Sequence, residues 1–189
     1  GMAAKGHFLR YIPDQMYSPR QPALFETEKI LSQSMLSRKR LVMTLDTNRF
    51  YVEQSLVCIV PHGVLTNDES PEAFPLEFLL GVLNSRLETF FFSTSIIDYS
   101  LGGGLIHATP GSQGKLLIPK AKEDRKTVVA SLVQRMLDLH KRFQGVTTEH
   151  ERTMLERQIA STDDEIDHLV YELYSLTPDE IAIVEESSK

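Results

Sequence analysis

Cysteine and tryptophan are nearly absent from this sequence, which contains one cysteine and no tryptophan among its 189 residues. A single thiol cannot form an intramolecular disulfide, so the disulfide-stapled folds of small secreted proteins are excluded. The cysteine, Cys58, lies inside an apolar run, and we expect a buried structural thiol with no chemical role. Core packing must therefore stabilise the fold.

Long apolar runs are absent as well. No stretch approaches the roughly 18 residues that a membrane-spanning helix needs, so we do not expect a membrane protein. The residues that follow Gly1-Met2, which we interpret as a tag remnant and a start methionine, lack the basic and then apolar layout of a signal peptide. The expected location is the cytoplasm.

Catalytic and metal-binding motifs are missing too. The six histidines have no paired cysteines and no His-x-x-x-His spacing, so the sequence offers no set of metal ligands. Residues 111–115 resemble a phosphate-binding loop, but Thr109 replaces its first glycine and Leu116 replaces the residue that would hold magnesium. Pro13-Asp14 and Asp124-Arg125-Lys126 resemble the two halves of a nuclease signature, but Asp124 opens a helix far along the chain from Asp14. We therefore expect no cofactor, no metal and no catalytic residue, and hence a protein that is not an enzyme by itself.

The net charge of −6 is unevenly distributed. Residues 1–60 hold eight Lys and Arg against five Asp and Glu, whereas residues 123–189 hold eight against fifteen. The net charges of these two segments are therefore +3 and −7. A basic front end permits a local phosphate-binding face, although the global negative charge would slow association with DNA.

The segment from Asp124 to Glu186 carries a long helical periodicity. Two apolar stripes recur at the three- and four-residue spacing of amphipathic helices, and the short link Gln144–Thr147 between them predicts an antiparallel helical hairpin. Two sets of apolar residues are expected to face each other across it: Val129, Leu132, Met136 and Leu139 on the first helix, and Leu155, Ile159, Ile166 and Leu169 on the second. Thr177–Glu180 has the pattern of a capping box, which predicts a short terminal helix over Pro178–Glu185.

The first half of the chain has the patterns of strands and of one buried helix. Three apolar or alternating runs predict strands joined by hairpin turns: Lys29–Met35, Arg40–Leu45 and Gln54–Val60. Residues 50–52 and 116–119 predict two further short strands. Apolar spacing over Pro75–Phe92 predicts a buried helix, in which Gly81 marks the close approach of another element.

These patterns together predict an α+β fold. It consists of a curved, mostly antiparallel or mixed sheet of about four strands with one buried helix, followed by a long antiparallel helical hairpin and a short C-terminal helix. We expect an α/β body over residues 3–122. The hairpin and terminal helix, residues 123–189, are expected to pack on this body as a single structural unit.

Several segments follow one another along the chain in a specific order: Glu28–Leu31, Asp46 with Tyr51, Ser55–Pro61, Phe78–Ser85, the glycine-containing loop, Leu117–Pro119 and Leu169–Thr177. Over roughly residues 25–186 this order resembles the TaqI-like C-terminal specificity domain of type II and IIG restriction-modification adenine DNA methyltransferases. In that family the domain follows the methyltransferase and selects the DNA sequence to be modified. The resemblance implies a non-catalytic target-recognition domain that binds double-stranded DNA and works with a methyltransferase or endonuclease module, in cis or in trans.

The DNA-binding residues are predicted from their chemistry. Arg38, Lys39 and Arg40, with Arg49 across the sheet, are expected to contact phosphates, because a phosphate backbone rewards clustered cations. A solvated turn that protects a sheet edge is an equal alternative for this cluster. In the loop 111–115 we expect Lys115 to lie near DNA, and Ser112 and Gln113 to reach base edges in a groove.

One alternative function stays open. The helical hairpin could be the working surface of a protein–protein interaction module, with the sheet as its base. The sequence also leaves open the DNA target, the oligomeric state, and whether the chain is a free-standing subunit or part of a longer enzyme.

Overall fold

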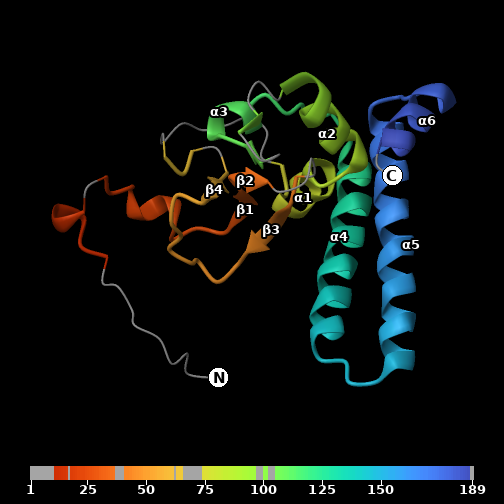
Figure 1. The fold of residues 1–189 in the computed structure, drawn as a ribbon, viewed down its shortest axis with the longest axis horizontal. Coiled ribbons are helices and arrows are strands. Elements are labelled where there is room, and N and C mark those ends of the chain that lie inside the picture. The colour runs from red at the N-terminus through yellow and green to blue at the C-terminus, as the bar shows by residue number, and fades with distance from the viewer. Residues whose placement is uncertain are drawn as a thin grey trace.

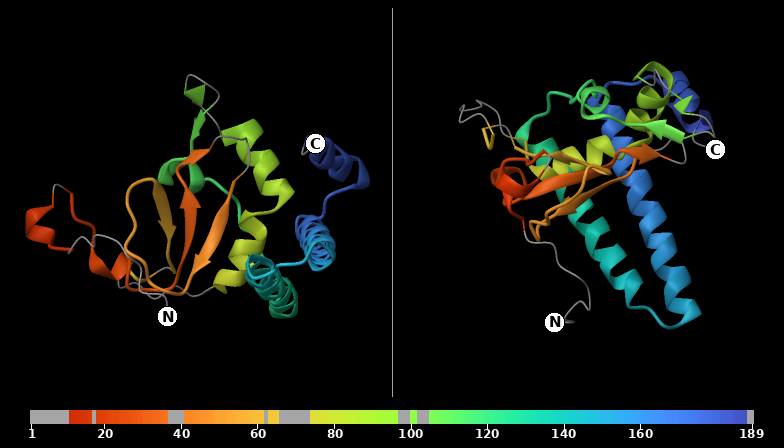
Figure 2. Two further views of the ribbon diagram at one scale, coloured as in Figure 1. Left: turned by 60° about the horizontal axis from the view of Figure 1, so that its bottom comes forward. Right: turned by 60° about the vertical axis from the view of Figure 1, so that its left-hand side comes forward.

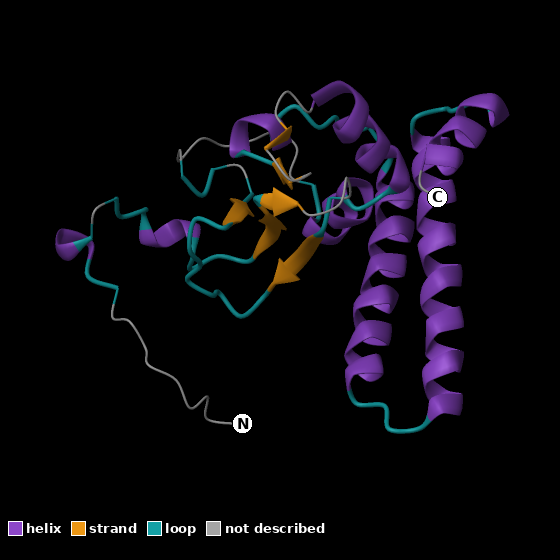
Figure 3. Ribbon diagram, viewed as in Figure 1, coloured by secondary structure: helices purple, strands orange, loops and turns teal. Residues whose placement is uncertain are grey.

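The computed structural model describes residues 11–16, 18–36, 41–61, 63–65, 74–96, 100–101 and 105–187. Figure 1 and Figure 3 show strands gathered in one part of the molecule and a pair of long helices beside them. The fold is α+β, as predicted, with antiparallel strands, a long helical hairpin and a short C-terminal helix. Two short 3-10 turns, Pro13–Gln15 and Pro22–Leu24, precede the first strand.

The main sheet has β1 (Lys29–Gln33) at its centre. β1 pairs antiparallel with β3 (Met43–Asp46) on one side and with β4 (Leu56–Ile59) on the other. The predicted hairpin between the second and third strands is therefore wrong, because the chain crosses the end of β1 and adds β4 at the opposite edge. The predicted strand at residues 50–52 is also absent from the sheet, since these residues belong to the crossing loop.

A second, smaller sheet has the order β2 (Met35–Leu36), β6 (Leu105–His107) and β5 (Ser100–Leu101), all antiparallel. Ser34 joins the two sheets. Its hydroxyl donates to the Ser55 carbonyl at 2.8 Å, and its own carbonyl accepts from the Ala108 N–H at 2.8 Å. The predicted returning strand at residues 116–119 is irregular chain instead, outside both sheets.

The predicted helix over Pro75–Phe92 is two helices, α1 (Leu76–Leu83) and α2 (Arg86–Phe91), followed by a π-helical turn, Phe92–Ile96. The break lies at Asn84-Ser85. The Asn84 side chain accepts from the Met43 N–H at 2.9 Å and donates to the Met43 carbonyl at 3.0 Å, while the Ser85 hydroxyl accepts from the Glu88 N–H and begins α2. Both side chains therefore compete with continuation of the helix.

Gly81 on α1 lies against the hairpin. A Cβ added at Gly81 would lie 2.8 Å from Val129 Cγ1 and 2.9 Å from Val133 Cγ2, so no larger residue fits without displacing these side chains. The predicted close approach at Gly81 is confirmed, and the approaching element is the first helix of the hairpin.

The hairpin consists of α4 (Glu123–Gln144) and α5 (Glu149–Leu173), which lie side by side in every view (Figure 2). The pairing of individual apolar residues across it stays a prediction.

α6 (Pro178–Ser187) begins with the predicted capping box, in which the Glu180 carboxylate accepts from the Thr177 N–H and hydroxyl, both at 2.8 Å. No helix within the described ranges is long and apolar enough to cross a membrane.

Polar contacts join the body to the hairpin at α2. The Arg86 guanidinium lies 2.7 Å from Asp164 and 3.2 Å from Asp167, and Asp167 also accepts from the Arg86 N–H at 2.9 Å. These bonds hold the start of α2 on the C-terminal half of α5. The division of the chain at residue 122 stays a prediction.

Candidate nucleic-acid interface

A buried ion pair lies at one end of the main sheet. Lys29, the first residue of β1, and Asp46, the last residue of β3, are paired across the two strands, with Nζ 2.5 Å from Oδ2. The Lys29 ammonium also donates to the Phe25 carbonyl at 2.9 Å. Burial alone would raise the pKa of Asp46, but hydrogen bonds from Lys29 and from two backbone N–H groups outweigh it and lower the pKa below its usual value. Asp46 is therefore ionised in the folded protein at neutral pH.

The Asp46 carboxylate also fixes the residues that follow it. Oδ1 accepts from the Asn48 N–H and Oδ2 from the Phe50 N–H, each at 2.9 Å. Between these two bonds Arg49 has φ 58, a left-handed conformation that is uncommon for residues other than glycine. We call residues 47–51 the Asp46 loop. All five of its side chains are exposed, and Phe50 is 58% exposed.

An aromatic cluster holds the far end of the Asp46 loop. The Tyr51 ring stacks on Phe25 with centroids 4.7 Å apart and leans on Tyr11 at 4.9 Å. Its hydroxyl donates to the Glu26 carboxylate at 2.7 Å. The loop is thus held at its start by Asp46, the last residue of β3, and at its end by residues that precede β1, while its middle faces solvent.

The predicted flexible loop at residues 111–115 is largely a one-turn helix, α3 (Pro110–Gln113). The Thr109 hydroxyl caps it by accepting from the Ser112 N–H at 3.0 Å, and the Ser112 hydroxyl donates to the Thr109 carbonyl at 2.9 Å. Gln113 is only 6% exposed and donates to the Ala108 carbonyl at 3.1 Å. In this conformation Gln113 supports its own turn and does not face solvent, whereas Lys115 does.

The structure does not bring all the predicted DNA-binding residues together. Arg38, Lys39 and Arg40 lie outside the described residues. Arg49 lies beyond the Lys29 end of β1, whereas the turn 109–115 starts beyond the other end, where Ala108 bonds to Ser34. The five residues of β1 separate these ends by about 16 Å at 3.3 Å per residue. Arg49 and Lys115 therefore belong to two separate exposed positions.

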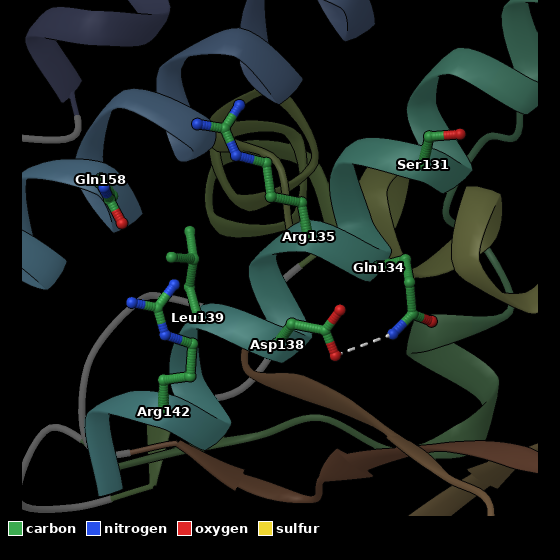
Figure 4. A pocket seen from close by; sticks show the side chains of 7 residues that line it. All are labelled: Ser131, Gln134, Arg135, Asp138, Leu139, Arg142 and Gln158. Atoms are coloured by element: carbon green, nitrogen blue, oxygen red, sulfur yellow. Dashed lines mark hydrogen bonds between the residues drawn. The ribbon is translucent and has the colours of Figure 1, made fainter. Parts of the chain in front are cut away.

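A groove of about 510 Å³ lies between the two hairpin helices (Figure 4). Arg135 and Arg142 both extend from α4 toward α5 beside Gln158, while Asp138 points the other way and accepts from Gln134 at 3.3 Å. The two arginines are seven residues apart, or about 10 Å along the helix axis. Arg135 lies 3.8 Å from Glu165 of α5 at a position that stays exposed. Exposed arginines at this spacing suit acidic groups on a binding partner.

One buried acid has a strongly shifted pKa but no access to solvent. Glu88 is 1% exposed, and burial raises its pKa to about 7 against the opposing effect of the Tyr174 hydroxyl. A substrate cannot touch a carboxyl group in this position. Within the described part of the chain, no three His, Cys, Asp or Glu side chains are close enough together to hold a metal ion.

Sequence reasoning missed the pairing of Lys29 with Asp46 and the exposure of Asn48 and Phe50. The turn chemistry of residues 46–49 was visible, because aspartate and asparagine commonly bond to nearby backbone N–H groups. No pattern in the sequence indicated that Lys29 is buried, because its burial follows from the central place of β1 in the sheet.

The comparison with family models gives one match, and the comparison with curated proteins gives none. The matching family is described as the TaqI-like C-terminal specificity domain, and it matches residues 1–102, just over half of the 189 residues. The match includes the main sheet, α1, α2 and the Asp46 loop, and it ends before β6 and the hairpin. The predicted resemblance over residues 169–177 lies beyond the matched range. The chain belongs to the family of TaqI-like C-terminal specificity domains.

Proposed function

We propose that this chain recognises a specific sequence of double-stranded DNA for a restriction-modification methyltransferase or endonuclease, and that it catalyses no step by itself. The observation that carries the proposal is the family match, which falls on the main sheet and its exposed Asp46 loop. We propose the cytoplasm as the location of this function. The target-recognition body spans residues 3–122.

The proposed contacts follow from residue chemistry and exposure. Arg49 and Lys115, with the cluster of Arg38, Lys39 and Arg40, contact phosphates. Ser112 is half-buried at the start of an exposed turn, where its hydroxyl oxygen can still accept a hydrogen bond from a base edge. Gln113 supports the turn through its hydrogen bond to the Ala108 carbonyl, so its role in DNA recognition is indirect in this conformation. Its side chain would reach a base only if the turn opened.

The hairpin has a different proposed role. It lies outside the family match, and its groove exposes Arg135 and Arg142 beside Gln158. We assign this surface to the methyltransferase or endonuclease module, whether that module is part of the same chain or a separate subunit. A protein–protein interaction module that does not bind DNA is the second candidate function, and the same groove favours it.

An electrophoretic mobility shift experiment separates the two functions. The complete chain is mixed with a pool of random duplexes at two salt concentrations, and bound duplexes are recovered and sequenced. A DNA-recognition domain shifts the pool, binds less tightly at the higher salt concentration and enriches one sequence. An interaction module that does not use DNA produces neither a shift nor an enriched sequence.

A further inference from the structure

We infer that the Asp46 loop contacts bases directly, with Asn48 and Phe50 as the contacting side chains and the Lys29–Asp46 pair as the device that positions them. This inference depends on the proposed DNA-recognition function and names the part of the surface that gives it sequence preference. Asn48 would recognise the edge of a base, and the Phe50 ring would pack on a thymine methyl group in the major groove.

The Asp46 loop is held in one conformation by buried groups. A buried ion pair loses much of its Coulomb energy to desolvation, so stability alone is a weak reason for placing Lys29 and Asp46 in the core. The pair does hold the Asp46 carboxylate in position to bind the N–H groups of Asn48 and Phe50. The backbone between them is fixed before any ligand binds, which removes part of the ordering cost of recognition.

Phe50 is exposed on this loop. Tyr51, its neighbour, is packed on Phe25 and Tyr11, but the Phe50 ring stacks on no other ring in the described part of the chain. Phe50 has one of the largest exposed fractions among the large apolar side chains.

Exposure of one apolar side chain is common and does not by itself indicate a ligand. Phe50 differs from Ile183 because it lies two residues from the exposed Asn48 on a backbone that Asp46 holds. The major groove of DNA presents thymine methyl groups beside the polar edges of bases, which suits this pair of side chains.

The charges near the loop in the sequence are mostly paired. Asp46 pairs with Lys29, Glu26 accepts from Tyr51 and Glu53 accepts from Ser55, while Glu28 is exposed. Arg49 is the single cation of the loop. Apart from Arg49, the loop carries no charge that could attract a phosphate backbone. Contacts by Asn48 and Phe50 should therefore add sequence preference without adding salt dependence.

The test uses the sequence that the complete wild-type chain enriches from random duplexes, together with a scrambled duplex of the same composition. Asn48→Ala and Phe50→Ala should each weaken binding to the enriched sequence by about tenfold or more, leave binding to the scrambled duplex unchanged and leave the salt slope unchanged. Ile183→Ala is the matched control, because Ile183 is a 56% exposed apolar side chain on α6, and it should change neither affinity.

The positioning role needs a separate variant. The double substitution Lys29→Met with Asp46→Asn removes both charges together, which avoids leaving one buried charge unpaired. It should reduce the ratio of the two affinities while binding to the scrambled duplex persists. If this variant fails to fold, the two exposed substitutions decide the inference.

Three results would overturn the inference. If the wild-type chain enriches no sequence, the proposed function fails and the inference fails with it. If the chain enriches a sequence and both exposed variants keep the wild-type ratio of affinities, the function stands and only the loop assignment is wrong. If both variants weaken binding to the two duplexes equally, the side chains of Asn48 and Phe50 contact DNA without reading its bases.

Discussion

The substitution Glu88→Gln should change how the stability of the protein depends on pH. Glu88 is buried in α2, and its carboxyl oxygen Oε1 lies 2.7 Å from the Tyr174 hydroxyl, which also reaches the Leu117 carbonyl. The hydroxyl has one proton, which it can donate to Glu88 or to the Leu117 carbonyl. Donation to Glu88 opposes the effect of burial on the pKa of Glu88 but does not outweigh it.

The magnitude follows from the pKa. Burial raises the pKa of Glu88 from 4.5 to about 7, so the folded protein favours the protonated form. The associated stability is fully present below pH 4.5 and is lost as the pH rises to about 7. At about 1.4 kcal/mol per pKa unit, the loss between pH 4.5 and pH 8 is about 3 kcal/mol. Glutamine cannot ionise, so the variant should not show this loss.

Urea unfolding at pH 4.5 and pH 8 measures the effect. The difference in unfolding free energy between Glu88→Gln and wild type should shift by about 3 kcal/mol in favour of the variant at pH 8. Comparing the two proteins cancels the opposite contributions of Asp46 and Glu180, whose pKa values are lowered. Glu186→Gln, at an exposed position on α6, is the control. A shift of less than about 0.5 kcal/mol would show that burial does not hold Glu88 protonated.

Other substitutions test the packing, the DNA contacts and the absence of catalysis. Gly81→Ala should destabilise the protein by about 1–3 kcal/mol in urea unfolding, because the new methyl group would meet Val129 and Val133 at under 3 Å. Adding Val133→Ala should recover part of this loss, and unchanged stability of Gly81→Ala would contradict the close approach. Met136→Asp should lower the free energy of unfolding by about 2–3 kcal/mol, because Met136 is half-buried in the hairpin. Gln134→Asp, on the exposed face, should lower it little, and equal effects of the two substitutions would contradict the predicted facing residues. Arg49→Gly removes the charge with a residue that tolerates the left-handed backbone at this position. It should weaken binding to all duplexes alike and lower the dependence of log affinity on log salt concentration by about 0.9. An unchanged salt dependence would show that Arg49 does not contact a phosphate. The purified chain should neither methylate nor nick a long DNA duplex in the presence of a labelled methyl donor and magnesium. Turnover that survives repurification would show that the chain is an enzyme.

The parts of the fold that the sequence predicted well are those with a long period. Twenty-two residues of α4 and twenty-five of α5 repeat the apolar stripe often enough to identify both helices. β2, β5 and β6 have two or three residues each, too few to show an alternation. The order of the strands in the main sheet could not be predicted from the sequence either. Turn residues between two strands do not reveal whether the second strand pairs with the first or crosses to another edge of the sheet.

The break between α1 and α2 was visible in retrospect. Ser85-Arg86-Leu87-Glu88 has the serine and glutamate spacing of a capping box, and in the structure Ser85 accepts from the Glu88 N–H. The apolar stripe continues through the break and hides it. The candidate site was harder, because exposure decides it. Gln113 and Phe50 have side chains that suggest the opposite of what the fold does with them: the polar one is buried and the apolar one faces solvent.

The bond between Asn84 and Met43 has a consequence for aggregation. β3 is an edge strand, and the free N–H and C=O groups of such a strand can recruit a strand from another molecule. The carboxamide of Asn84 occupies both groups of Met43, as a neighbouring strand would. A foreign strand would have to displace it before it could pair along β3, so one amide side chain makes this edge a poor template for amyloid-like growth.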